Sequence, residues 1–147
     1  MGFDARTGIS LPGTVLLAPA DLGHTDTKTA WFDMSGYEGC LITISTGILT
    51  GADGSNYVTP ALYEHDTTAD AGSTAVAAED TTGSTIAVKN TTAAEIQSAC
   101  YIGSKRYVGV NLTYTGALIT AGVVGVTAYG IKPLNTPDTS AAAVART

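Results

Sequence analysis

The chain has 147 residues, a net charge of −6 and only 14% charged residues, with a mean hydropathy of +0.19. This length allows one domain with a real core and is short for two. The negative net charge disfavours electrostatic binding to the phosphates of a nucleic acid, so we expect no nucleic-acid partner. So few charges indicate either burial against other proteins or a compact β protein with a neutral, Thr-rich surface.

Targeting signals are not evident in the sequence. No run approaches the roughly 18 apolar residues of a membrane span, and residues 1–10 lack the apolar stretch of a signal peptide. We therefore expect no membrane partner and no export by a standard signal.

The first part of the chain predicts an arm followed by short β segments. Residues 1–13 contain glycines, a proline and isolated apolar residues, which is typical of an extended arm. Residues 14–18 form an apolar run compatible with a first strand or a docked arm. Residues 27–33 contain Trp31 and Phe32, whose aromatic bulk favours a β segment.

A hairpin with a long loop is predicted next. Residues 39–49 alternate between apolar and polar side chains with a period of two, and residues 57–64 resume an extended pattern. The stretch between them is rich in turn-forming residues. Pro60 cannot donate to a β ladder, so we expect an edge strand or a bulge there.

Residues 65–83 are acidic and rich in Thr and Ala, which indicates a surface excursion with at most one helical turn at 75–79. Residues 84–89 are expected to form a short strand. Residues 92–100 are compatible with a helix or with the start of a strand, and the pattern does not separate the two.

The clearest local pattern is a C-terminal hairpin. Residues 107–115 alternate with a period of two, and a second β-rich run covers residues 120–131. The connection between them opens with Gly116, which suits a turn. Residues 134–147 are rich in small residues and predict a second arm, flexible or docked on a partner.

These segments together predict an all-β fold, a jelly-roll-like sandwich or small barrel of about six to eight strands. We expect a single domain over residues 1–147. Its core covers about 14–133, and the arms are 1–13 and 134–147.

No catalytic or metal constellation is visible in the sequence. His24 and His65 lie in polar stretches, and no nucleophile elbow or zinc-ligand spacing accompanies them. The acidic loop at 53–56 lacks the calcium-binding pattern and favours a turn. We therefore expect no catalytic residue, no metal, no cofactor and no enzyme activity.

Cys40 and Cys100 are the only cysteines and stand far apart beside apolar, strand-like residues. Two buried reduced thiols in a protein made in a reducing cytosol are the expectation. A bridge between neighbouring strands remains an alternative.

Lys105 and Arg106 are a basic pair just before the strongest predicted strand. They suit two solvated side chains at a strand entrance, or a contact with an acidic neighbour in an assembly.

The same region carries a family resemblance. Residues 101–110, YIGSKRYVGV, resemble the Y-x-G-x-K-R-Y-V-x-V strand of small tailed-phage virion proteins. The Gly/Ala/Val run ending in Lys132-Pro133 and the segment 39–44 are similar as well. The resemblance covers about half of the chain, and its motifs are structural.

What the resemblance implies is a capsid cement or decoration protein, an all-β subunit on the outside of an HK97-type shell. Its expected partner is the major capsid protein, with self-association as a dimer or trimer. The location would be the capsid surface of the virion, after synthesis in the host cytoplasm. No catalytic residue is carried over.

Four aromatic residues are further candidates for interface anchors, although each also suits a core: Trp31, Phe32, Tyr37 and Tyr57. Two other functions remain alternatives. One is a tail-tube, head-completion or fibre-associated phage protein, and the other is a carbohydrate-binding β-sandwich module.

Overall fold

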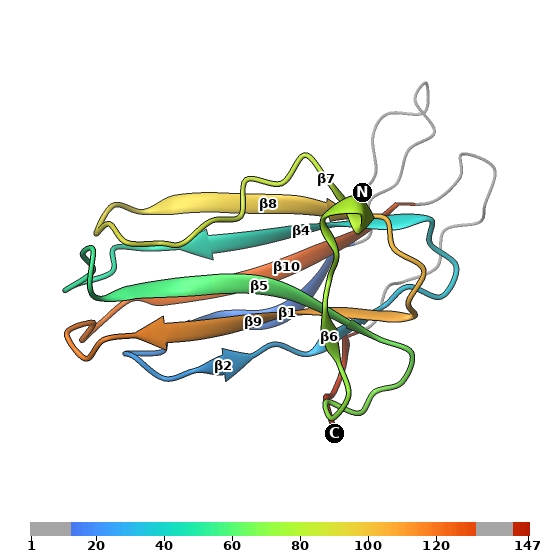
Figure 1. Ribbon diagram of the computed structural model, residues 1–147, viewed down its shortest axis with the longest axis horizontal. Helices are drawn as coiled ribbons and strands as arrows, with labels where there is room; N and C mark the ends of the chain where they lie inside the picture. Colours follow the sequence, from blue (N-terminus) through green and yellow to red (C-terminus); the bar gives the residue numbers. More distant parts are fainter. Residues whose placement is uncertain (1–12, 132–142) are drawn as a thin grey trace.

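The computed structural model describes residues 13–131 and 143–147, which form two antiparallel sheets packed face to face (Figure 1). Sheet A contains, in spatial order, β1 (Gly13–Asp21), β10 (Val123–Ile131), β4 (Gly39–Thr46), β8 (Glu95–Tyr101) and β7 (Thr81–Thr82). Sheet B contains β11 (Ala143–Val144), β3 (Trp31–Asp33), β9 (Tyr107–Thr115), β5 (Tyr57–His65) and β6 (Thr74–Ala75), with β2 (Thr27–Lys28) also paired to β9.

The prediction of an all-β fold is confirmed, and the architecture is a sandwich rather than a closed barrel. The long strands are β1, β4, β5, β8, β9 and β10, and the remaining ones are two or three residues long. Most of residues 92–100, for which the sequence allowed a helix or the start of a strand, belong to the strand β8. Among the described residues, one 3-10 turn, η1 (Ala78–Asp80), overlaps the end of the segment 75–79, where one helical turn was expected. Residues 84–89 do not form the expected strand, apart from a bridge between Lys89 and Val58.

One core fills the space between the sheets. Alternate residues of the long strands point inward and are almost fully buried, among them Ile42 and Ile44 from sheet A and Val108, Val110 and Leu112 from sheet B. Burial of each such side chain contributes about 1.5–3 kcal/mol. The apolar half of each alternating pattern therefore holds the two layers together.

The predicted C-terminal hairpin is wrong, because β9 and β10 belong to different sheets. Residues 116–122 carry the chain from sheet B to sheet A at one end of the sandwich (Figure 1). Ile119 in this connection is fully buried in the core. The connection therefore passes from one layer to the other, with Ile119 packed in the core between them.

The predicted hairpin of residues 39–49 and 57–64 is wrong for the same reason, since β4 lies in sheet A and β5 in sheet B. The two crossing connections support each other. Thr50 pairs with Ala121 in an isolated bridge. The side chain of Asn56 accepts hydrogen bonds from the backbone of Ala117 and Leu118, each at 3.1 Å.

Pro60 lies on an edge, as predicted. Strand β5 pairs with β9 along its whole length, while on its other side the described residues meet it near its end, through β6 and Val76, and at the Val58 bridge. The backbone N–H of Val58 points to that outer side, where it bonds Lys89. Pro60, two residues on, faces the same way and leaves no ladder bond unmade.

The C-terminal arm differs from the expectation at its end. Residues 143–147 lie on this chain's own sheet B, where β11 pairs with β3. The other expected arm residues, 1–12 and 134–142, lie outside the described residues. Among the described ones, no helix is long and apolar enough to cross a membrane.

Candidate functional site

Lys105 and Arg106 lie in a tight connection between β8 and β9. Tyr101, fully buried, donates a hydrogen bond of 2.6 Å to Glu64 and accepts one of 3.1 Å from the backbone N–H of Lys105. A Cβ on Gly103 would lie 2.6 Å from the Tyr101 ring, so only glycine fits this close approach. The buried tyrosine therefore shapes the loop that presents the two cations.

Burial, followed by the hydrogen bond to Glu64, raises the pKa of Tyr101. The phenol consequently stays protonated at neutral pH and remains a donor to the Glu64 carboxylate. The buried pair of Tyr101 and Glu64 therefore holds the 103–106 loop in place through the hydrogen bond from Lys105.

Both cations are engaged in ion pairs within the chain. The Lys105 ammonium lies 2.6 Å from the Asp66 carboxylate, and the Arg106 guanidinium forms two hydrogen bonds, of 3.1 and 3.2 Å, to Asp33. The hydrogen bonds from Arg106 lower the pKa of Asp33, and the hydrogen bond to Asp66 raises the pKa of Lys105. Arg106 also stands over the Tyr107 ring, 5.2 Å from its centre.

A hollow of about 370 Å³ opens beside the connection between β8 and β9, between the 34–37 turn and the 103–106 loop. Its lining combines two cations, an anion, two serine hydroxyls and the phenol ring of a tyrosine: Met34, Ser35, Tyr37, Asp66, Gly103, Ser104, Lys105 and Arg106. The structure thus brings together three of the six candidate residues, Lys105, Arg106 and Tyr37. We call this feature the charged hollow.

The other three candidates lie elsewhere. Trp31 and Phe32 are fully buried within the chain, which agrees with burial inside the protein, the other reading of these aromatic residues, rather than with an exposed anchor. Phe32 belongs to the core, with the Tyr37 ring 5.4 Å away. Tyr57 is half-buried at the opposite end of β5 from His65 and pairs with Thr115, far from the charged hollow.

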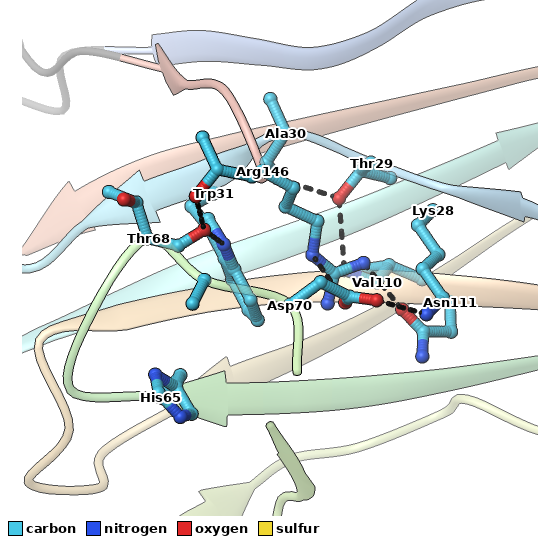
Figure 2. Close-up of polar contacts among 12 residues, drawn as sticks. Lys28, Thr29, Ala30, Trp31, His65, Thr68, Asp70, Val110, Asn111 and Arg146 are labelled. Carbon is cyan, nitrogen blue, oxygen red and sulfur yellow. Dashed lines mark hydrogen bonds and ion pairs between the residues drawn. The ribbon is translucent and has the colours of Figure 1, made fainter. Parts of the chain in front are cut away.

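Trp31 is buried by the C-terminal segment rather than by the core. Its ring lies on the outer side of sheet B, over Gly109, and the Arg146 guanidinium stacks on it at 3.8 Å from the ring centre (Figure 2). The indole N–H donates to the Thr68 carbonyl at 3.0 Å. Thr147 bonds the same segment through the carbonyl of Thr68 and the N–H of Asp70.

Arg146 holds the C-terminal segment over Trp31 through polar contacts that the sequence did not indicate. Its side chain is 7% exposed, and it donates a 2.6 Å hydrogen bond to Asn111 and lies 3.6 Å from Asp70 (Figure 2). Lys28 forms a second ion pair with Asp70, and its hydrogen bond lowers the pKa of that carboxyl. Burial lowers the pKa of Arg146 itself.

The remaining chemical candidates do not form a site. Among the described residues, no three His, Cys, Asp or Glu side chains are grouped so that they would hold a metal ion. Cys40 pairs with Tyr101 and Cys100 with Leu41 on neighbouring strands, so the two thiols point to opposite faces of sheet A and cannot bridge. Cys40 is buried, as expected, whereas Cys100 is half-buried.

Searches of the sequence against protein-family models, and searches for similar curated proteins and solved structures, found no match. The functional argument therefore depends on the geometry described above and on the resemblance of residues 101–110.

Proposed function

We propose that the protein is a structural virion component, a cement or decoration protein that binds the outer surface of a tailed-phage capsid and stabilises contacts between major capsid proteins. The observation that supports this function is the charged hollow. Residues 101–110, which resemble a strand of phage virion proteins, supply one wall of it and both of its cations.

The hollow suits a contact with a protein loop. Its cations are partly exposed and already paired with carboxylates, so a partner carboxylate can join either pair without burying a lone charge. Tyr37 and Met34 supply apolar surface beside these charges. A single contact of this kind is weak, and repetition on a symmetric shell increases the total affinity.

The test is binding to purified capsids of the phage whose genome encodes the chain. Reversal of both charges, Lys105→Glu with Arg106→Glu, places four carboxylates in or beside the hollow. We expect at least a tenfold loss of co-sedimentation with capsids, equivalent to about 1.4 kcal/mol or more.

Lys28→Glu is the matched control, since Lys28 is also an exposed, ion-paired cation but lies on sheet B away from the hollow. It is expected to leave capsid binding unchanged. Full capsid binding by the double variant would assign Lys105 and Arg106 to the solvated alternative.

Copy number separates this function from the alternatives. A cement protein repeats over the whole shell, while a head-completion or other connector protein attaches at one vertex and occurs in only a few copies per particle. Strong saccharide binding without capsid affinity, measured by calorimetry, would instead favour the carbohydrate-binding module.

A further inference from the structure

Three residues of the sandwich together make a site for a guanidinium group (Figure 2). The Trp31 ring offers a flat aromatic face, with its centre 3.8 Å from the guanidinium carbon of Arg146. Asn111 accepts a hydrogen bond of 2.6 Å from this guanidinium, and a carboxylate oxygen of Asp70 lies 3.6 Å from its Nε. A planar cation that stacks on a ring and faces a carboxylate is recognised by its shape as well as its charge. We call Trp31, Asp70 and Asn111 the guanidinium site.

The guanidinium site is held in place by contacts that do not involve the C-terminal segment. The indole N–H of Trp31 donates to the Thr68 carbonyl at 3.0 Å. The Trp31 ring lies directly on the sheet because Gly109 has no side chain, and a Cβ there would be 3.1 Å from the ring. Lys28 forms an ion pair with the Asp70 carboxylate. We therefore expect the site to keep its shape when the C-terminal segment leaves it.

The C-terminal segment binds to sheet B as a peptide ligand binds to a receptor. Strand β11 adds two residues to the edge of the sheet beside β3. The N–H of Thr147 donates to the Thr68 carbonyl at 3.0 Å, and the Thr147 oxygen accepts a 2.8 Å hydrogen bond from the Asp70 N–H. Arg146 then supplies the one buried side chain. Main-chain bonds at a sheet edge with a single side-chain anchor are a known mode of peptide recognition.

The fit of Arg146 in the guanidinium site is incomplete. Its side chain is 7% exposed, yet its Nε and Nη2 and the Oδ1 of Asp70 are buried without a hydrogen-bond partner. Unpaired buried polar atoms weaken a contact, and a two-residue edge strand belongs to the least stable parts of a fold. We therefore expect the C-terminal segment to open and close while the sandwich stays folded. A guanidinium closer to Asp70 would pair the atoms that Arg146 leaves unpaired.

The charges of the molecule favour a basic ligand at this position. The chain has a net charge of −6, which attracts a cationic segment. A lysine ammonium is a point charge and lacks the planar group that stacks on a ring while it bonds an acceptor at its edge. The site therefore selects arginine over lysine.

We propose that the guanidinium site binds an arginine-bearing extended segment of another protein, and that the chain's own residues 143–147 occupy the site until such a partner displaces them. The spacing in the chain itself, Val144 two positions before Arg146, describes the ligand: a small or β-branched residue at the sheet edge and an arginine on the ring. The partner competes with the chain's own segment for the open state. This inference goes beyond the proposed function and does not depend on it.

The first experiment measures binding of a fluorescein-labelled peptide AVART, the sequence of residues 143–147, by fluorescence anisotropy. Arg146→Ala in the full chain empties the guanidinium site and is expected to increase the affinity for AVART at least tenfold over the parent chain. The peptides AVAKT and AVAAT are expected to bind at least tenfold more weakly than AVART. Added to Arg146→Ala, Asn111→Ala is expected to weaken AVART binding at least tenfold. The exposed Asn90→Ala is the matched control and is expected to leave binding unchanged.

The second experiment uses the parent chain without any substitution. Excess AVART is expected to accelerate amide hydrogen exchange in residues 143–147 several-fold and to leave β9 unchanged, whereas AVAAT is expected to change neither.

Four results would overturn the proposal: no tighter AVART binding by Arg146→Ala than by the parent chain, equal binding of AVART and AVAKT, full binding in the Asn111→Ala background, or unchanged exchange in residues 143–147. Without peptide, exchange in residues 143–147 that changes with protein concentration would identify a second copy as the occupant and would also contradict the proposal. None of these readouts involves capsids, so they are separate from the test of the proposed function.

Discussion

Arg146 and Trp31 form a stacked pair that covers part of the outer surface of sheet B. The guanidinium covers the only tryptophan of the chain and is itself nearly buried. A cation over an aromatic face contributes about 0.5–2 kcal/mol, depending on how far it is desolvated. The pair therefore secures the last residues of the chain to sheet B.

Arg146→Ala is expected to lower the free energy of unfolding by about 1–3 kcal/mol and to shift the Trp31 emission to longer wavelength, because water reaches the indole. Chemical denaturation followed by fluorescence measures both effects. Arg106→Ala removes an exposed arginine away from Trp31 and is the control. An unchanged emission spectrum in Arg146→Ala would contradict the stacking.

Asn56 has a comparable role at the other end of the sandwich, where it is 5% exposed and accepts two backbone hydrogen bonds from the crossing connection. Asn56→Ala leaves two N–H groups unpaired and is expected to cost about 2–4 kcal/mol in unfolding free energy. Urea denaturation measures this cost. The exposed Asn90→Ala is expected to stay within about 0.5 kcal/mol of the parent.

The sequence was a better guide to candidate site residues than to the partners with which they interact. It singled out Lys105 and Arg106 as a basic pair and Tyr37 as one of four aromatic candidates, and these three line one hollow. The other three aromatic candidates do not line it. The sequence missed Asp33 and Asp66, which pair with the cations across long sequence separations. Arg146 gave no local signal, because its partner Trp31 is reached only when the chain end returns to β3.

At the scale of elements, strand positions were predictable and strand pairing was not. A period of two marks a half-buried strand whether its neighbour in sequence lies beside it or in the facing sheet. Residues 107–115 were predicted with the correct bounds, yet β9 pairs with β5, β3 and β2 and not with β10. The burial of Ile119 and the hydrogen bonds of Asn56 accompany the crossing from one sheet to the other. Both depend on residues that are distant in the sequence.

The crossing connections give a direct test of this topology. Gly51 has φ +90°, and a Cβ there would lie 1.8 Å from the Leu118 carbonyl oxygen in the other connection. Gly51→Ala is expected to lower the unfolding free energy by at least about 2 kcal/mol. Gly54→Ala, in the same loop with nothing within 4 Å, is the matched control and should be nearly neutral in thermal denaturation. Equal melting temperatures would contradict the packing of the two connections.

At the scale of the whole molecule, the carboxylates set the response to acid. Hydrogen bonds from Arg106 and Lys28 lower the pKa values of Asp33 and Asp70 from 3.8. A lowered folded-state pKa means that the unfolded chain binds more protons near that pH, so the stabilisation is present above about pH 4 and is lost as pH falls below it.

The free energy of unfolding is therefore expected to stay level from pH 7 to about pH 5 and to fall below about pH 4. Urea denaturation across this range measures it. Asp33→Asn and Asp70→Asn should each reduce the acid-dependent loss. A loss centred above pH 5 would assign the acid response to other groups.

The molecule as a whole combines the charged hollow with the guanidinium site on sheet B, and the proposed function depends on the first. Electron microscopy of capsids, reconstructed with and without added protein, tests that function most directly. We expect added density at repeated sites on the outer shell, with the 34–37 turn and the 103–106 loop facing the capsid protein. A shell that stays bare at saturating protein would contradict the proposed function.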